Sequence, residues 1–252
     1  MTSVKEWQPL HVRAGHRFQS IAERELDTDL RSLAARLPHG DDDILLIPEF
    51  AGANGIADLV SLTRSREALH SRISSGIPFL TNLMDASIVA SVPIGRTAAV
   101  SSTAVKLGMS ERQLSGRVRR LVSNGSLLKF GHGFRRDPNI IPIGRMYAFE
   151  AKVTDWRRAM SQAVRYGTWS DAVGVVLLNR PRDISAAADR ARTFKIGLAV
   201  GKTWIVRPRI RPNDVGLRLF ASERFCETTA LSSPLSTIAI GDYGVHRPSA
   251  DA

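Results

Sequence analysis

The sequence is poor in the residues that cross-link a chain or bind zinc. It contains one cysteine, Cys226, and six histidines that are scattered along 252 residues. A single cysteine cannot form an intramolecular disulfide, and it leaves no cysteine cluster for a zinc ion. This cysteine usage fits a reducing compartment, and we therefore expect a cytoplasmic protein.

Long hydrophobic runs are also missing. No apolar stretch approaches the length that spans a bilayer, and the N-terminus lacks the basic and then apolar pattern of a secretory signal. We therefore expect no membrane partner. The chain has neither a phosphate-binding glycine loop nor a nucleophile elbow, so nucleotide hydrolysis and serine hydrolase chemistry have no support.

Basic residues, in contrast, are in excess. There are 35 Lys and Arg against 24 Asp and Glu, which gives a net charge of +11. Such a charge favours a polyanionic partner, although an anionic membrane surface would also attract it. Residues 96–137 contain nine Arg and Lys but two acids, so one sixth of the chain carries +7 of the +11. The charge is localised, and DNA is the favoured partner.

The segment around this charge predicts three helices followed by a hairpin. Ser110 is a predicted helix N-cap, Gln113 completes a capping box, and Asn124 with the glycine after it predicts the helix end. The predicted helices cover 85–92, 97–107 and 110–125, and two short strands around a Gly-His-Gly turn cover 127–138. This order resembles a winged helix-turn-helix of the common bacterial type.

The resemblance implies that the third helix enters the major groove and that the wing contacts the DNA backbone or the minor groove. The implied contacts are Arg112, Gln113, Ser115, Arg117, Arg119 and Arg120 on the helix, and His132, Arg135 and Arg136 on the wing. The alternative is a winged helix that binds protein, with its arginines solvated.

A second feature runs from Met146 to Tyr166, which predicts a short strand and then a helix. Side chains two apart on a strand share a face, so Glu150 and Lys152 project together, roughly 6–7 Å apart along the chain. A carboxylate can hold a hard divalent cation, and an ammonium group can stabilise phosphate charge or position a water. The pair therefore suits phosphodiester chemistry.

Further polar residues are predicted to converge on this pair. Residues 44–62 predict two strands joined by a Gly/Asn turn, with Asp58 isolated in the apolar second strand. A charge in a buried strand needs a partner or a metal. Gln162 and Tyr166 are four apart on the predicted helix, so they lie on one face of it.

These residues resemble the PD-(D/E)XK nuclease superfamily, which has the restriction-endonuclease-like fold. Asp58 matches the metal-binding aspartate of the family, Glu150 and Lys152 match its acid and lysine, and Gln162 and Tyr166 match its helical Gln-x-x-x-Tyr element. The resemblance implies Mg²⁺ or Mn²⁺ held by Asp58, Glu150 and the carbonyl of Ala151.

Three acids are open candidates for a further site residue. Glu23 or Glu25 would supply the additional acid of the first helix, and Glu49 lies in the first core strand. The chain departs from the family pattern at Ala57, where the eponymous motif has proline, and in the long interval between Asp58 and Glu150.

We therefore expect an α/β protein with a restriction-endonuclease-like mixed sheet flanked by helices and a small inserted winged-helix domain. The expected domains are 1–82 and 143–231 for the core, 83–142 for the insert, and 232–252 as a disordered tail. Further elements are predicted as helices over 17–37, 183–192 and 218–227 and strands over 169–178, 197–200 and 203–206. The core would cut or nick DNA, and the alternative is a catalytically silent DNA-binding regulator or accessory protein. We also expect a homodimer.

Overall fold

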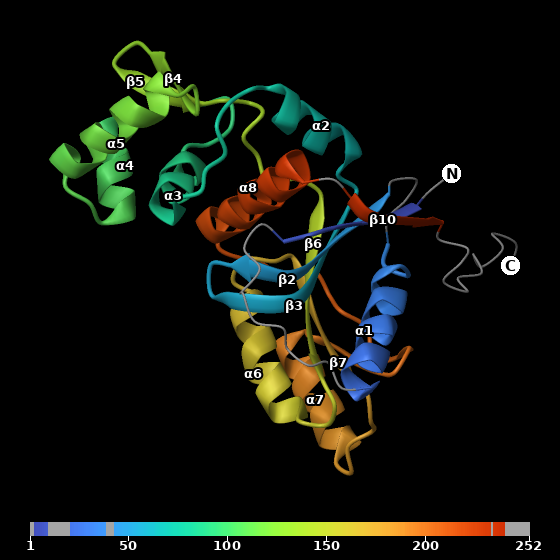
Figure 1. Ribbon diagram of the computed structural model, residues 1–252. Helices are drawn as coiled ribbons and strands as arrows, with labels where there is room; N and C mark the ends of the chain where they lie inside the picture. Colours follow the sequence, from blue (N-terminus) through green and yellow to red (C-terminus); the bar gives the residue numbers. More distant parts are fainter. Residues whose placement is uncertain (1–2, 10–20, 39–42, 233, 240–252) are drawn as a thin grey trace, which may run out of the picture.

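The computed structural model describes residues 3–9, 21–38, 43–232 and 234–239 (Figure 1). They form an α/β protein in which helices flank one large mixed sheet, and this level of the predicted fold class is confirmed. No helix in these ranges is long and apolar enough to cross a membrane.

The large sheet has eight strands in the order β10-β1-β2-β3-β6-β7-β8-β9. The strands are β1 (Ser3–Trp7), β2 (Ile44–Gly52), β3 (Gly55–Thr63), β6 (Arg145–Lys152), β7 (Ala172–Leu177), β8 (Gly197–Val200), β9 (Thr203–Val206) and β10 (Pro234–Ala239). The pairs β1–β2, β6–β7 and β7–β8 are parallel, and the other neighbours are antiparallel. Every residue of β7 is buried, as its continuous apolar sequence predicts for a strand covered on both faces.

Helices cover both faces of this sheet. The helix α1 (Ile21–Ala34) packs on one face through its leucines, and the other face carries α6 (Trp156–Tyr166), α7 (Ile184–Phe194) and α8 (Val215–Leu231). The start of the first predicted helix, residues 17–20, lies outside the described residues. The last helix is longer than predicted, because the side chain of Asp214 caps it by accepting from the backbone N–H groups of Gly216 and Leu217.

A smaller unit lies beside α8 and away from α1, α6 and α7 (Figure 1). It contains α3 (Leu83–Ser91), α4 (Val100–Leu107), α5 (Glu111–Ser123), β4 (Leu127–Phe130) and β5 (Gly133–Arg136). The predicted capping box of Ser110 and Gln113 is confirmed at the start of α5. The unit has an apolar cluster of its own, which includes Leu114, Leu121 and Phe134.

The smaller unit is packed directly onto the sheet domain. Leu219 of α8 belongs to the apolar cluster of the unit. At Gly216, a Cβ atom would lie 2.7 Å from the Ser87 hydroxyl oxygen of α3, so the two helices meet closely where this glycine has no side chain. The unit is therefore held against the core by helix packing as well as by the chain segments that enter and leave it.

A buried ion pair fixes the segment that leads into this unit. Arg72, in α2 (Arg66–Ser74), donates from Nε and Nη2 to the two carboxylate oxygens of Glu223 at 2.8 and 2.7 Å, and both side chains are fully buried. The same guanidinium donates to the carbonyl oxygens of Ile77 and Pro78, and Glu223 accepts the Leu80 N–H. The charges are paired and the remaining hydrogen-bonding groups are satisfied, which is what their burial requires.

The prediction of a disordered tail is wrong for residues 234–239. They form β10, which pairs antiparallel with β1 in a register that places Ile238 opposite Val4. The small and polar composition after Ser232 hid this strand, because its stability comes from the open edge of β1. Residues 240–252 lie outside the described residues.

We predict that Arg72→Met destabilises the protein by about 3–5 kcal/mol, because it leaves the Glu223 carboxylate buried and without its counter-charge. Urea unfolding followed by circular dichroism measures this loss. Arg158→Met is the matched control, because Arg158 is exposed on α6 and a surface substitution changes stability by about 0.5 kcal/mol or less. Equal unfolding midpoints for the two variants would contradict the prediction.

Candidate functional site

The candidate site lies where β3 and β6 separate. Their antiparallel ladder ends at the pair Leu59–Phe149, and the next positions in register are Asp58 and Glu150. There the Asp58 carboxylate accepts the Ala151 N–H at 2.7 Å. The Asp58 side chain thus takes the place that a backbone carbonyl of β3 would have in a continued ladder. Asp58 and Glu150 occupy opposite positions just beyond the last pair.

Glu150 is the buried centre of the site. Its side chain is 1% exposed, so its charge requires partners. Lys152 Nζ lies 2.5 Å from Oε1, and the Tyr166 hydroxyl donates to Oε2 at 2.7 Å. Lys152 also donates to the carbonyl oxygen of Ala151 at 3.1 Å. The predicted convergence of Glu150, Lys152 and Tyr166 is present in the structure.

Tyr166 joins α6 to the β2–β3 hairpin as well as to Glu150. Its hydroxyl lies 2.6 Å from the carbonyl oxygen of Ile56, a second acceptor for the same proton. Burial raises the pKa of Tyr166 far above its ordinary value, and the hydrogen bond to Glu150 raises it further. The side chain of Gln162 acts in the opposite direction and lowers the pKa of Tyr166. Tyr166 is therefore a neutral donor that holds one oxygen of Glu150 in place.

Asp58 is the acid of the site with the clearest electrostatic perturbation. Burial, followed by the nearby charge of Glu150, raises the pKa of Asp58 to about 6. The Ala151 N–H and the Lys152 ammonium lower it, while the charge of Glu49 raises it again. The site therefore brings acids close enough to disfavour their joint ionisation in the absence of a further cation.

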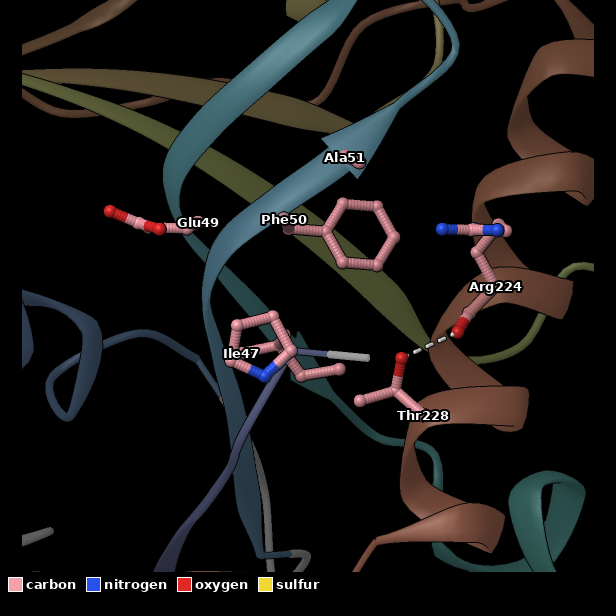
Figure 2. A pocket seen from close by; sticks show the side chains of 7 residues that line it. Ile47, Glu49, Phe50, Ala51, Arg224 and Thr228 are labelled. Atoms are coloured by element: carbon pink, nitrogen blue, oxygen red, sulfur yellow. Dashed lines mark hydrogen bonds between the residues drawn. The ribbon is translucent and has the colours of Figure 1, made fainter. Parts of the chain in front are cut away.

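Glu49 stands opposite Asp58 in the β2–β3 hairpin. The pairs on either side of this position are Pro48–Leu59 and Phe50–Ala57. Glu49 has a φ of 45°, in the left-handed region, and its side chain is exposed. Figure 2 shows this side chain pointing away from Phe50 and from α8. The kink at Glu49 turns its carboxylate outward, near enough to Asp58 to affect its pKa.

The β2–β3 hairpin also borders a small hollow on the side of α8. Figure 2 shows its lining residues, which are Pro9, Ile47, Glu49, Phe50, Ala51, Arg224 and Thr228. The Thr228 hydroxyl donates to the carbonyl oxygen of Arg224 within the helix. The lining does not include Asp58, Glu150 or Lys152, so the hollow is separate from the candidate site.

The remaining candidates of the core are placed less centrally. Gln162 is half-buried, and its Oε1 atom has no hydrogen-bond partner among the described residues. Glu25 is exposed on α1, which packs on the opposite face of the sheet from α6. The side chain of Glu23 lies outside the described part of the structure.

The predicted groove residues of α5 fall into two groups. Arg112 and Arg119 are exposed, and no ion pair involves them within the described residues. Arg117 and Arg120 instead contact the Asp85 carboxylate of α3 at 2.9 and 2.5 Å.

Among the polar residues of α5, Gln113 accepts from the N-cap Ser110 through its side-chain oxygen, and Ser115 is half-buried. Sequence reasoning missed Asp85, which lies 32 residues before Arg117 and carries no local sign of this contact.

The hairpin β4–β5 divides its basic residues between two faces. His132 is exposed at the turn, and Arg135 points outward with its guanidinium 3.4 Å from the centre of the Phe130 ring. Arg136 is 9% exposed and donates from Nε to the carbonyl oxygen of Ile140 at 2.5 Å. The prediction that Arg136 contacts DNA is therefore corrected, because alternation along β5 turns this side chain inward.

Within the described ranges, no group of three or more His, Cys, Asp and Glu residues is arranged to hold a metal ion. The candidate donors at the ladder end are two carboxylates and a main-chain carbonyl. No family model, curated protein or solved structure matches the chain. Function must therefore be inferred from the contacts of these residues themselves.

The raised pKa of Asp58 predicts a pH-dependent contribution to stability in metal-free buffer. The folded state binds this proton with a pKa of about 6, above the ordinary value of 3.8. Protonated Asp58 therefore contributes to the free energy of unfolding below pH 4, and this contribution is lost as the pH rises toward 6. Asp58→Asn cannot ionise, so we expect the variant to lack this loss.

Urea unfolding in EDTA at pH 4.5 and pH 7.5 tests the expectation. The stability of Asp58→Asn relative to the unmodified protein should increase between the lower and the higher pH. Asp189→Asn, at an exposed position of α7, controls for the loss of a surface carboxylate. A relative stability of Asp58→Asn that is the same at both pH values would show that Asp58 keeps an ordinary affinity for its proton.

Proposed function

We propose that this chain is a metal-dependent deoxyribonuclease of the PD-(D/E)XK type, with an inserted winged helix that binds DNA. One observation carries the catalytic part of the proposal: a fully buried carboxylate, Glu150, lies in contact with Lys152 and Tyr166 where Asp58 closes the β3–β6 ladder. A buried acid and a lysine at a point where two strands separate are costly for stability alone, and such groups cluster at functional sites.

The donor set fits Mg²⁺ or Mn²⁺. Asp58, Glu150 and the Ala151 carbonyl offer oxygen ligands, which hard divalent cations prefer. Two of these oxygens already share a cationic group, because the Lys152 ammonium contacts both Glu150 Oε1 and the carbonyl oxygen of Ala151. A bound metal would activate a water molecule and offset charge on the scissile phosphate.

The residues of the chain have separate roles in this proposal. Tyr166 fixes Glu150 by donating to Oε2, which leaves Oε1 for a cation. Lys152 is 29% exposed, so its ammonium reaches solvent, where it would orient the attacking water or stabilise the negative charge of the phosphate. Gln162 shapes the site through Tyr166. Asp58 holds its place through the Ala151 N–H.

The binding part of the proposal rests on the basic segment of the smaller unit. We infer that residues 83–142 form the winged helix, with α5 in the major groove and the β4–β5 hairpin as the wing. Exposed Arg112 and Arg119 are the free phosphate and base contacts of α5. The charges of Arg117 and Arg120 are partly neutralised by Asp85, so we assign these two residues a smaller share of the DNA-binding free energy.

The second candidate function is a DNA-binding regulator or accessory protein that does not cut. The contact of Lys152 with Glu150 and the Ala151 carbonyl favours it, because the lysine lies on two of the oxygens that a metal would need. In this case the ammonium would act as a permanent internal counter-ion. A cleavage assay distinguishes the two functions, because the regulator or accessory protein would bind DNA without cutting it in either Mg²⁺ or Mn²⁺.

For the catalytic proposal we expect the purified protein to nick or cut DNA with Mg²⁺ or Mn²⁺ and to be inactive in EDTA. Lys152→Ala should lower the cleavage rate about 100-fold or more, because it removes the cation that stabilises the phosphate. Conversion of supercoiled plasmid to open-circle and linear forms measures both. Lys202→Ala, at an exposed turn between β8 and β9, is the matched control. Undiminished cleavage by Lys152→Ala would remove the catalytic assignment.

For the binding proposal we expect Arg112→Ala combined with Arg119→Ala to weaken duplex binding and to flatten its salt dependence. The slope of log affinity against log salt should fall by about 0.9 for each phosphate that the variant no longer neutralises. Fluorescence anisotropy over a range of salt concentrations measures it. Arg190→Ala combined with Arg192→Ala removes the same charge from exposed positions of α7 and should leave the slope unchanged. If the α7 variant lowered the slope and the α5 variant did not, the DNA-binding surface would not lie on α5.

The predicted homodimer remains a prediction. Light scattering at micromolar concentration, with and without a DNA duplex, distinguishes a dimer from a single chain of 27.6 kDa. A monomer would favour nicking of one strand over a double-strand break.

A further inference from the structure

The hairpin β4–β5 carries an exposed apolar and aromatic face that phosphate binding does not explain. Leu128 is 44% exposed and Phe130 is 50% exposed, whereas Leu127 and Phe134 are buried in the cluster beneath. Side chains alternate along a strand, so Leu128 and Phe130 share the face that points away from this cluster. Contacts to phosphate need charge, yet this face presents two large apolar side chains.

An arginine is fixed on the same face. Arg135 lies opposite Leu128 in the hairpin register. Its guanidinium lies over the Phe130 ring at 3.4 Å from the ring centre, and its Nε donates to the Thr97 hydroxyl at 2.9 Å. The Thr97 segment is itself attached to the hairpin, because Ala98 and the strand residue Phe134 exchange two backbone hydrogen bonds. The ring and the guanidinium are therefore arranged before any ligand binds.

This arrangement selects a flat and negatively charged ligand. Residues 127–136 contain Lys129, His132 and two arginines but no acid, so the charge of the hairpin attracts an anion. Aromatic rings and arginine planes both stack on nucleic acid bases, and this stacking is tolerant of sequence. A base attached to its phosphate combines the flat surface and the charge that the hairpin matches.

Whether the bound base is paired or unpaired follows from which of its surfaces a side chain can reach. In a continuous duplex the faces of each base are covered by its neighbours, so a side chain at the surface reaches only the edges of the bases. We propose that the Phe130–Arg135 stack binds an unpaired base, and that the DNA class this protein acts on contains unpaired bases at a bulge, gap or fork. This inference rests on the proposed function and specifies its substrate class.

Two DNAs of matched sequence test the inference with the full-length protein. One is a continuous duplex, and the other carries a single unpaired 2-aminopurine as a one-base bulge. Anisotropy of a terminal dye measures affinity for both, and 2-aminopurine fluorescence reports stacking of the unpaired base. We expect the protein to bind the bulged DNA about tenfold more tightly than the duplex and to quench the 2-aminopurine.

Matched variants separate stacking from apolar contact and from charge. Phe130→Leu keeps apolar bulk without the ring, and Arg135→Lys keeps the charge without the planar group. Phe130→Leu should lose the preference and the quenching while it retains duplex affinity within about threefold. Arg135→Lys should lose the quenching, and Phe130→Trp should retain the preference, the quenching and the duplex affinity. The half-exposed position of Phe130 makes these substitutions compatible with folding, and thermal unfolding of each variant checks this.

The outcomes distinguish the inference from the proposed function. Equal affinity for the two DNAs, or a full preference in Phe130→Leu, overturns the inference and leaves duplex binding and cleavage as proposed. Failure to bind either DNA overturns the proposed function itself, and the inference with it.

Discussion

The buried charge of Glu150 is the constraint on which the site depends. A carboxylate that is 1% exposed is stable only if nearby groups compensate its charge and hydrogen-bonding capacity. Lys152 supplies the charge from the same strand, and Tyr166 supplies a proton donor from α6. Because these partners come from different elements, the position of α6 against the sheet and the chemistry of the site are set together. A shift of α6 would leave an oxygen of Glu150 without its donor.

The second organising feature is the contact between the smaller unit and α8. The chain leaves the sheet after β3 and returns in β6, so the unit is inserted between the two strands that frame the candidate site. Arg72 and Glu223 hold the outgoing segment, and Leu219 places α8 inside the apolar cluster of the unit. A DNA surface on this unit would therefore have a fixed position relative to the candidate site. DNA bound by the unit would then determine which part of a DNA strand reaches the site.

The parts of the structure that sequence predicted are those encoded over short distances. The capping box of α5 needs Ser110 and Gln113 three residues apart, and the shared face of Glu150 and Lys152 needs only strand alternation. The convergence of Asp58 with Glu150 is predicted from the need of a buried charge for a partner and from the family resemblance, since the two residues are 92 positions apart and no local pattern joins them. The hydrogen bond from Ala151 to Asp58 is a consequence of where the ladder ends, which no local pattern encodes.

Two of the three failures have a long-range origin. Asp85 neutralises arginines on another helix, so their availability to DNA could not be judged from α5 alone. The inward turn of Arg136 depends on the phase of a strand only four residues long. The strand β10 lies in a segment of small and polar composition, and it pairs with the free edge of β1. The errors over the α5 arginines and over β10 thus concern residues whose environment is supplied by a distant part of the chain.

The pairing of β1 with β10 also has a consequence for biosynthesis. The strand β1 lies between β2 and β10, so its two neighbours are separated by most of the sequence. During translation β1 can pair with β2 early, but its other edge stays open until residues 234–239 have left the ribosome. An unpaired strand edge is a site for pairing with other chains. Residues 234–239 therefore close this edge as well as extend the sheet.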